Sequence, residues 1–205
     1  MKTYIRSSTK GFTLIELIIT VGVISAVMIG ATTVLPGMLK ASRADGSSAI
    51  VINALRLARD RAIGERRNMD VLFIAPNEIK IVREEIVYNA VTMTWGSSPT
   101  GPTNPTVMDV FLAENQKFQY FTGMIDTPDL FGRTNAPLAF GPVSGTVPTI
   151  MFTSEGTLVD VSGDPINGTI FLGTGADLSS ARAITIFGTT ALVRGWKWDG
   201  VKWTE

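Results

Sequence analysis

The chain has 205 residues, a length that accommodates an N-terminal span and one globular domain of ordinary size. It contains no cysteine and no histidine, which excludes a disulfide framework, a cysteine nucleophile, a histidine-based triad and a zinc site of the usual kind. Its 18 basic residues balance its 18 acidic residues, so no overall charge attracts nucleic acid. We therefore predict no catalytic residue, no cofactor and no metal, and we do not expect an enzyme.

The chain opens with a short polar leader that carries three positive charges and no acid: Lys2, Arg6 and Lys10. Residues 12–39 follow, and this run of 28 residues holds one charge, Glu16. A helix needs about 20 apolar residues to cross the hydrocarbon core of a bilayer. Positive flanking residues stay on the cytoplasmic side. We therefore expect a single transmembrane helix, with the N-terminus in the cytoplasm and the C-terminal domain outside it.

Processing is predicted before the apolar run. No A-x-A-like site follows residue 39, whereas Gly11 is a small residue beside the basic Lys10. A cut at Gly11 would remove residues 1–11 as a leader and leave the apolar helix on the mature protein. Loss of the three leader charges would leave 15 basic against 18 acidic residues, a net charge of −3.

The sequence Gly11-Phe12-Thr13-Leu14-Ile15-Glu16 resembles the processing site of type IV prepilins and type II secretion pseudoprepilins. The resemblance implies cleavage between Gly11 and Phe12 by the prepilin peptidase and N-methylation of Phe12. It also implies that Glu16 meets the amino terminus of a neighbouring subunit in a helical filament. The implied partners are other pilin or pseudopilin subunits, the peptidase and an inner-membrane assembly platform. A plain signal anchor, in which Gly11 and Glu16 are incidental, is the alternative.

A long helix is predicted, with a transmembrane or filament-core half (residues 12–39) and an amphipathic half (residues 40–68). Pro36-Gly37 is expected to kink or loosen it, because proline removes one helical hydrogen bond. One apolar stripe at helical spacing favours packing of the second half on a sheet. The stripe consists of Val51, Ala54, Leu55, Ala58 and Ala62.

From residue 69 the pattern predicts strands and turns. The expected strands are residues 69–75, 79–83, 86–95, 107–112, 118–122, 149–152, 157–161, 166–172, 183–187 and 191–194. Residues 97–106 and 123–148 are expected to be loops, because prolines and glycines recur along them.

The fold class predicted for the whole chain is α+β: a long N-terminal helix, transmembrane in its first half, packed against a C-terminal antiparallel β-sheet domain (residues 69–205). The strands and glycines of the last third, together with the preceding LRLARDRAI, resemble the GspH/FimT family of minor pseudopilins. The resemblance implies a pilin-like fold. Residues 97–148 are expected to depart most from relatives.

Three aspartates lie among glycine and serine in the β-region: Asp160, Asp164 and Asp177. Some major pseudopilins hold calcium near the C-terminus, and carboxylates suit that cation. However, the spacing of Asp160 and Asp164 does not fit an EF-hand loop, and aspartate is an ordinary turn former. We expect turns, with calcium as the alternative.

Two basic segments could contact nucleic acid, and FimT-like minor pilins have been associated with DNA uptake. The first contains Arg56, Arg59, Arg61, Arg66 and Arg67. The second interleaves Arg194 and Lys197 with Trp196 and Trp198, a pattern that could bind phosphates and stack bases. Acidic residues interrupt both segments, so we favour a helix–sheet junction and an amphipathic edge hairpin. Trp196, Trp198 and Trp203 either close the core or form an exposed patch for a partner subunit.

We therefore predict a structural minor pilin or pseudopilin. Its N-terminal helix would assemble into a type II secretion pseudopilus or a type IV pilus, at initiation or at the tip. The alternatives are a DNA-binding minor pilin for DNA uptake and a membrane-anchored periplasmic enzyme.

Overall fold

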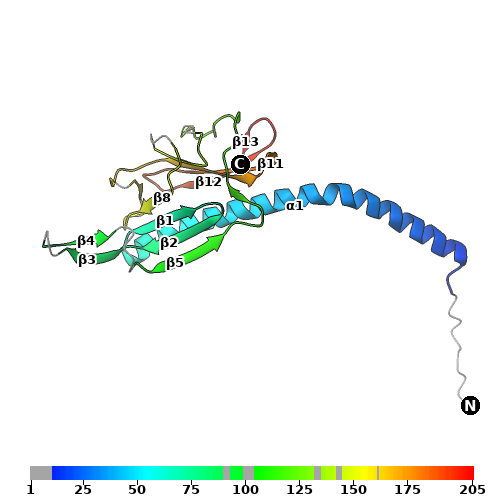
Figure 1. Ribbon diagram of the computed structural model, residues 1–205, viewed down its shortest axis with the longest axis horizontal. Coiled ribbons are helices and arrows are strands. Elements are labelled where there is room, and N and C mark those ends of the chain that lie inside the picture. Colours follow the sequence, from blue (N-terminus) through cyan, green and yellow to red (C-terminus); the bar gives the residue numbers. More distant parts are fainter. Residues whose placement is uncertain (1–10, 90–92, 99–103, 132–134, 142–144, 161) are drawn as a thin grey trace, which may run out of the picture. The chain divides into compact units, whose positions relative to one another are not determined.

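The computed structural model describes residues 11–205 except 90–92, 99–103, 132–134, 142–144 and 161 (Figure 1). It also leaves out the side chains of residues 30–35, 87–89, 94–95 and 97–98. The predicted leader, apart from Gly11, lies outside the described residues. The chain divides into two compact units, Met1–Lys40 and Ala41–Glu205, which are described separately below.

Helix α1 (Leu14–Glu65) contributes to both units, which confirms the predicted long helix. Pro36 lies inside α1 and does not end it. The helix stops at Glu65 because Arg66 adopts a left-handed φ of 50°. The Arg66 N–H then donates to Ile63 O at 3.4 Å and the Arg67 N–H to Ala62 O at 3.1 Å. These two bonds form a Schellman cap with arginine where glycine is usual.

In the second unit the strands of the described residues form three antiparallel sheets (Figure 1). The first has the order β5-β2-β1-β8-β9, the second β13-β12-β11-β10-β6 with β7 also pairing with β10, and the third is the hairpin β3-β4. The bounds are β1 Met69–Ile74, β2 Glu78–Arg83, β3 Glu85–Asn89, β4 Thr94–Ser98, β5 Thr106–Phe111, β6 Lys117–Phe118, β7 Leu138–Phe140, β8 Thr149–Phe152, β9 Leu158–Val159, β10 Gly168–Thr174, β11 Asp177–Ile186, β12 Val193–Trp198 and β13 Trp203–Thr204.

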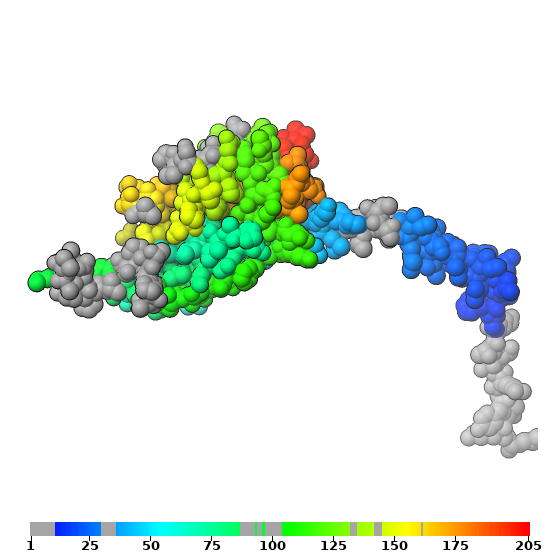
Figure 2. Space-filling view, viewed as in Figure 1, coloured from blue at the N-terminus to red at the C-terminus, as the bar shows by residue number. Residues whose placement is uncertain are grey.

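The main core lies where the second half of α1 meets both large sheets. Figure 2 shows segments from distant parts of the sequence gathered into one compact body in the second unit. The predicted stripe of α1, from Val51 to Ala62, is fully buried in one cluster with β1, β2, β8, β10 and β11. Burying one large apolar side chain contributes about 1.5–3 kcal/mol, so this cluster holds the helix on the sheets. The predicted α+β class and the helix–sheet packing are confirmed.

The predictions for residues 86–95, 118–122 and 123–148 were wrong, and of the second range only Phe118 lies in a strand, β6. Residues 86–95, expected as one strand, form the hairpin β3-β4, in which Asn89 pairs with Thr94. The sequence between them lacks the glycine or proline that would have marked a turn. The predicted loop 123–148 contains β7, which pairs with Gly168–Ile170 of β10 and is buried. Gly168 allows this approach, because a Cβ there would lie 1.9 Å from the Phe140 ring.

The C-terminal tryptophans close a second apolar cluster instead of forming an exposed patch. Trp196 and Trp198 are each 8% exposed, and Trp203 is 4% exposed. Trp198 and Trp203 pack edge to face with centroids 5.2 Å apart, and the Trp196 Nε1–H donates to Thr185 Oγ1 at 2.9 Å. Of the two alternatives that the sequence left open, the core reading is correct.

Arg182 on β11 anchors the start of the second unit. Its side chain is 2% exposed, and its Nε donates to Asp45 Oδ1 at 2.7 Å. The terminal nitrogens donate to the carbonyls of Ala41, Ser179 and Ala181, at 2.8–3.4 Å. Asp45 and Ala41 belong to α1, so this buried arginine fastens the helix to the six-stranded sheet. We call this arrangement the Arg182 clamp.

An ion-pair network at the end of α1 predicts a pH dependence of stability. Hydrogen bonds from Arg83 and Arg61 hold the pKa of the Glu65 carboxyl below its ordinary value of 4.5. A lowered folded-state pKa means that this stabilisation is complete above pH 4.5 and is lost as the pH falls through the folded pKa. We expect the free energy of unfolding, measured by urea titration, to fall less for Glu65→Gln than for the wild type when the pH is lowered from about 5 to about 3. Equal acid slopes for the two proteins would contradict this.

Candidate processing and assembly site

Thr13 and Glu16 form a capping box at the start of α1. The Thr13 N–H and Oγ1–H both donate to Glu16 Oε2 at 3.3 Å, and the Glu16 N–H donates to Thr13 Oγ1 at 3.3 Å. Thr13 is the N-cap residue and Glu16 the third helical residue, which is the S/T-x-x-E arrangement. The bonds satisfy two backbone donors that a helix start otherwise leaves unpaired. The Glu16 carboxylate is thus held against Thr13, the residue that directly follows Phe12, the expected mature N-terminus.

The apolar side chains that follow are exposed around the helix in the isolated chain. Phe12 is 83% exposed, Leu17 is 58% exposed, and the large apolar residues up to Ile29 are similar. A helix that is apolar all round needs lipid or neighbouring helices to cover it. The Thr20 hydroxyl donates to Leu17 O and the Ser25 hydroxyl donates to Val21 O. Neither side chain would therefore expose an unpaired hydroxyl to lipid or to a neighbouring helix.

The structure places the candidate residues of the opening stretch together. Gly11 and Phe12 precede the helix, exposed, and Glu16 lies in its first turn. An added Cβ at Gly11 would meet nothing within 4 Å. The sequence reasoning missed Thr13, although the Thr-x-x-Glu spacing ahead of an apolar run is a capping-box signal.

Of the four C-terminal nucleic-acid candidates, the structure buries the two tryptophans and pairs both cations with aspartates. Burial leaves neither Trp196 nor Trp198 free to stack on a base. Arg194 pairs with buried Asp129 at 2.9 Å and lies over the Phe187 ring. Lys197 lies 4.0 Å from Asp45. The DNA-binding alternative therefore loses the aromatic contacts on which it depended.

Two of the three aspartates of the β-region accept hydrogen bonds from their own turns. Asp160 Oδ1 accepts the N–H groups of Ser162 and Asp164 at 2.8 and 3.0 Å. Asp177 Oδ1 accepts from the N–H and hydroxyl of Ser179. Within the described part of the chain no group of three acidic, histidine or cysteine residues could hold a metal ion. The turn interpretation accounts for Asp160 and Asp177.

Residues 6–32 match the family described as the prokaryotic N-terminal methylation motif. The chain has a prepilin-type N-terminal segment. The match covers Gly11, Phe12, Thr13 and Glu16, so it confirms the predicted resemblance over the stretch where the capping box lies. A search of curated proteins found no match.

Solved structures with a partial likeness to the chain also include pilin-like proteins. The minor pseudopilin EpsH of the type 2 secretion system of Vibrio cholerae is 13% identical, with 76% of this chain and 97% of that chain covered and a TM-score of 0.41. The type IV minor pilin FimU of Pseudomonas aeruginosa (strain PAO1) is 16% identical, with 80% and 91% covered and a TM-score of 0.42. These TM-scores describe a partial similarity of the backbone trace. The assignment of a prepilin-type segment rests on the match of residues 6–32 alone. Among the described residues, no helix combines the length and apolarity that a membrane crossing requires.

Proposed function

We propose that this protein is a structural subunit, a minor pilin or pseudopilin, that assembles through its N-terminal helix into a type IV pilus or a type II secretion pseudopilus. The supporting observation is the prepilin-type segment together with a helix whose large apolar side chains are exposed from Leu14 to Ile29. Such a surface is stable only when covered. Before assembly the inner membrane would cover it, and in the filament the helices of other subunits would do so.

The membrane orientation belongs to the same proposal. Lys2, Arg6 and Lys10 would remain in the cytoplasm, and the β-domain would face the periplasm. The prepilin peptidase would cut between Gly11 and Phe12, and the new amino group of Phe12 would be methylated. We assign a structural and not a catalytic role, with position at the initiation complex or tip.

Processing provides the direct test. We expect Gly11→Val to abolish cleavage when the protein is co-expressed with a prepilin peptidase, because the site requires a small residue. The wild type should yield a mature N-terminus at methylated Phe12, as read by N-terminal sequencing and intact mass.

The matched control is Gly22→Val. Like Gly11, Gly22 has no atom within 4 Å of an added Cβ, so the two substitutions are matched in the open space around that atom. The control should be cleaved as the wild type is. A wild-type mature N-terminus at any residue other than Phe12 would overturn the proposed function.

A further inference from the structure

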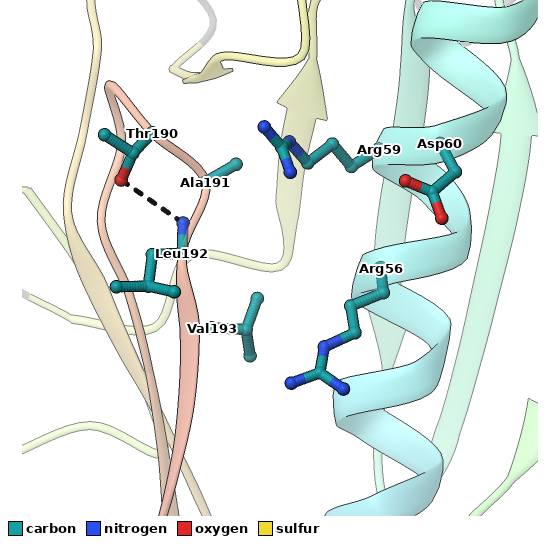
Figure 3. Close-up of a pocket in the computed structure, with 7 residues that line it drawn as sticks. All are labelled: Arg56, Arg59, Asp60, Thr190, Ala191, Leu192 and Val193. Carbon is teal, nitrogen blue, oxygen red and sulfur yellow. Dashed lines mark hydrogen bonds between the residues drawn. The ribbon is translucent and has the colours of Figure 1, made fainter.

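A hollow in the second unit lies between the C-terminal part of α1 and the chain that leads into β12. Its volume is about 440 Å³. Figure 3 shows the side chains of Arg56 and Arg59 extending from α1 toward this chain segment. The hollow is lined by Arg56, Arg59, Asp60, Thr190, Ala191, Leu192 and Val193. None of these residues belongs to the N-terminal site described above.

Arg56 and Arg59 both place guanidinium N–H groups at the hollow that donate to no other residue described in the structure. They are three residues apart on α1 and therefore share a helix face. Arg59 Nε donates to Gly156 O at 3.3 Å, which holds the guanidinium at the hollow while its terminal nitrogens make no hydrogen bond within the described residues. The Arg56 side chain makes no hydrogen bond or ion pair with any part of the chain that the structure describes. In contrast, Arg61 on the same helix is paired with Glu65 at 3.0 Å.

The opposite wall is apolar and held in a strained turn. Ala191 has a φ of 48°, in the left-handed region that residues other than glycine adopt at a cost in free energy. Ala191 and Val193 are buried, whereas Leu192 between them is 48% exposed. The Leu192 N–H donates to Thr190 Oγ1 at 3.4 Å, and Leu192 O accepts from the Phe187 N–H at 3.0 Å. The turn therefore keeps an apolar side chain at the surface beside two guanidinium groups.

The charge of the hollow indicates what it accepts. Two guanidinium groups and the Asp60 carboxylate give a net formal charge of +1, which one carboxylate would neutralise. Arginine matches a carboxylate through two parallel hydrogen bonds. The Asp60 carboxylate would repel a chain of phosphates, and the exposed Leu192 favours an apolar neighbour beside the acid.

We propose that this hollow receives an aspartate or glutamate side chain, flanked by an apolar residue, from a neighbouring subunit of the filament. The proposal rests on the proposed function, because that function supplies the neighbour. It adds a lateral contact made by the globular domain to the contact made by the N-terminal helix.

The test uses the full-length protein in filaments sheared from cells that also express its assembly partners. Arg56→Lys and Arg59→Lys keep the positive charge and introduce an amine, which a carbodiimide joins directly to a carboxylate in contact. We expect mass spectrometry to find the introduced amine coupled to an aspartate or glutamate of another subunit. Arg61→Lys is the control, and it should couple to Glu65 of its own chain.

A second variant tests whether the contact matters. We expect Arg56→Gln/Arg59→Gln to enter filaments about tenfold less than the wild type, because the bound carboxylate is left without a partner. Its tryptophan fluorescence and urea midpoint should stay close to those of the wild type. An assembled lysine variant that couples to no other subunit, or wild-type levels of the double glutamine variant in filaments, would overturn this inference alone. Absence of the wild type from filaments would overturn the proposed function as well.

Discussion

A Glu16→Gln variant should fold and insert as the wild type does, yet enter filaments about a hundredfold less well, since breaking a buried charge pair costs about 3 kcal/mol. Glutamine can still accept the Thr13 hydrogen bonds and so keeps the capping box. What it lacks is the negative charge that would neutralise the methylated amine of the adjacent subunit. Glu16→Ala lacks both the charge and the cap, so it should enter filaments at least as poorly as Glu16→Gln. The measurement is the amount of each variant in sheared filaments relative to the membrane fraction.

Thr13→Val is the matched control for the cap. It removes the Thr13 hydroxyl, which bonds Glu16 in both directions, but leaves the carboxylate in place. Loss of an N-cap typically costs about 1 kcal/mol, so this variant should assemble at a level much closer to that of the wild type. If Glu16→Gln assembled normally while Thr13→Val failed, Glu16 would act through the helix cap and not through its charge.

Arg182→Ala should lower the free energy of unfolding by about 3 kcal/mol, the range for a buried charged partner that is removed. The change leaves a void and unpaired carbonyls at Ser179 and Ala181, and it frees Asp45 of α1. Because Asp45 itself is 54% exposed, most of the loss should come from the buried Ala181 carbonyl and the void. Urea unfolding of the full chain in detergent micelles, followed by tryptophan fluorescence, measures the change.

Arg43→Ala provides the comparison on the same helix. Arg43 pairs with Glu114 at 3.0 Å, but both side chains are exposed. Exposed ion pairs contribute about 0–1 kcal/mol, so this variant should unfold close to the wild type. If both variants lost the same free energy of unfolding, the stabilisation by Arg182 would not depend on its burial.

The helix and its buried stripe could be predicted because a period of 3.6 residues repeats over many residues. Val51, Ala54 and Leu55 alone define the face that meets the sheets. Short elements carry no such repetition. The three residues of β7 are buried because Gly168 of a distant strand leaves room for Phe140, and no local pattern reports that.

The functional residues divide in the same way, into those that a local motif reveals and those that only the fold brings together. Gly11, Phe12 and Glu16 are adjacent in sequence, so a local motif could reveal them. The pairing of Arg182 with Asp45 joins residues 137 positions apart, and the hollow at Arg59 requires the turn at Ala191. The tryptophans Trp196 and Trp198 were ambiguous because an alternating strand pattern does not state which face is covered.

The second unit begins at Ala41 inside α1, so in the proposed filament subunit a load that reaches the domain along the helix would enter it at this end. The first residues of the second unit to bear that load are Ala41 and Asp45, which the Arg182 clamp fastens to the six-stranded sheet. Only beyond them does the load reach Val51 and the core. We therefore expect the strength of the Arg182 clamp to set the tension at which this end of the helix begins to separate from the sheet.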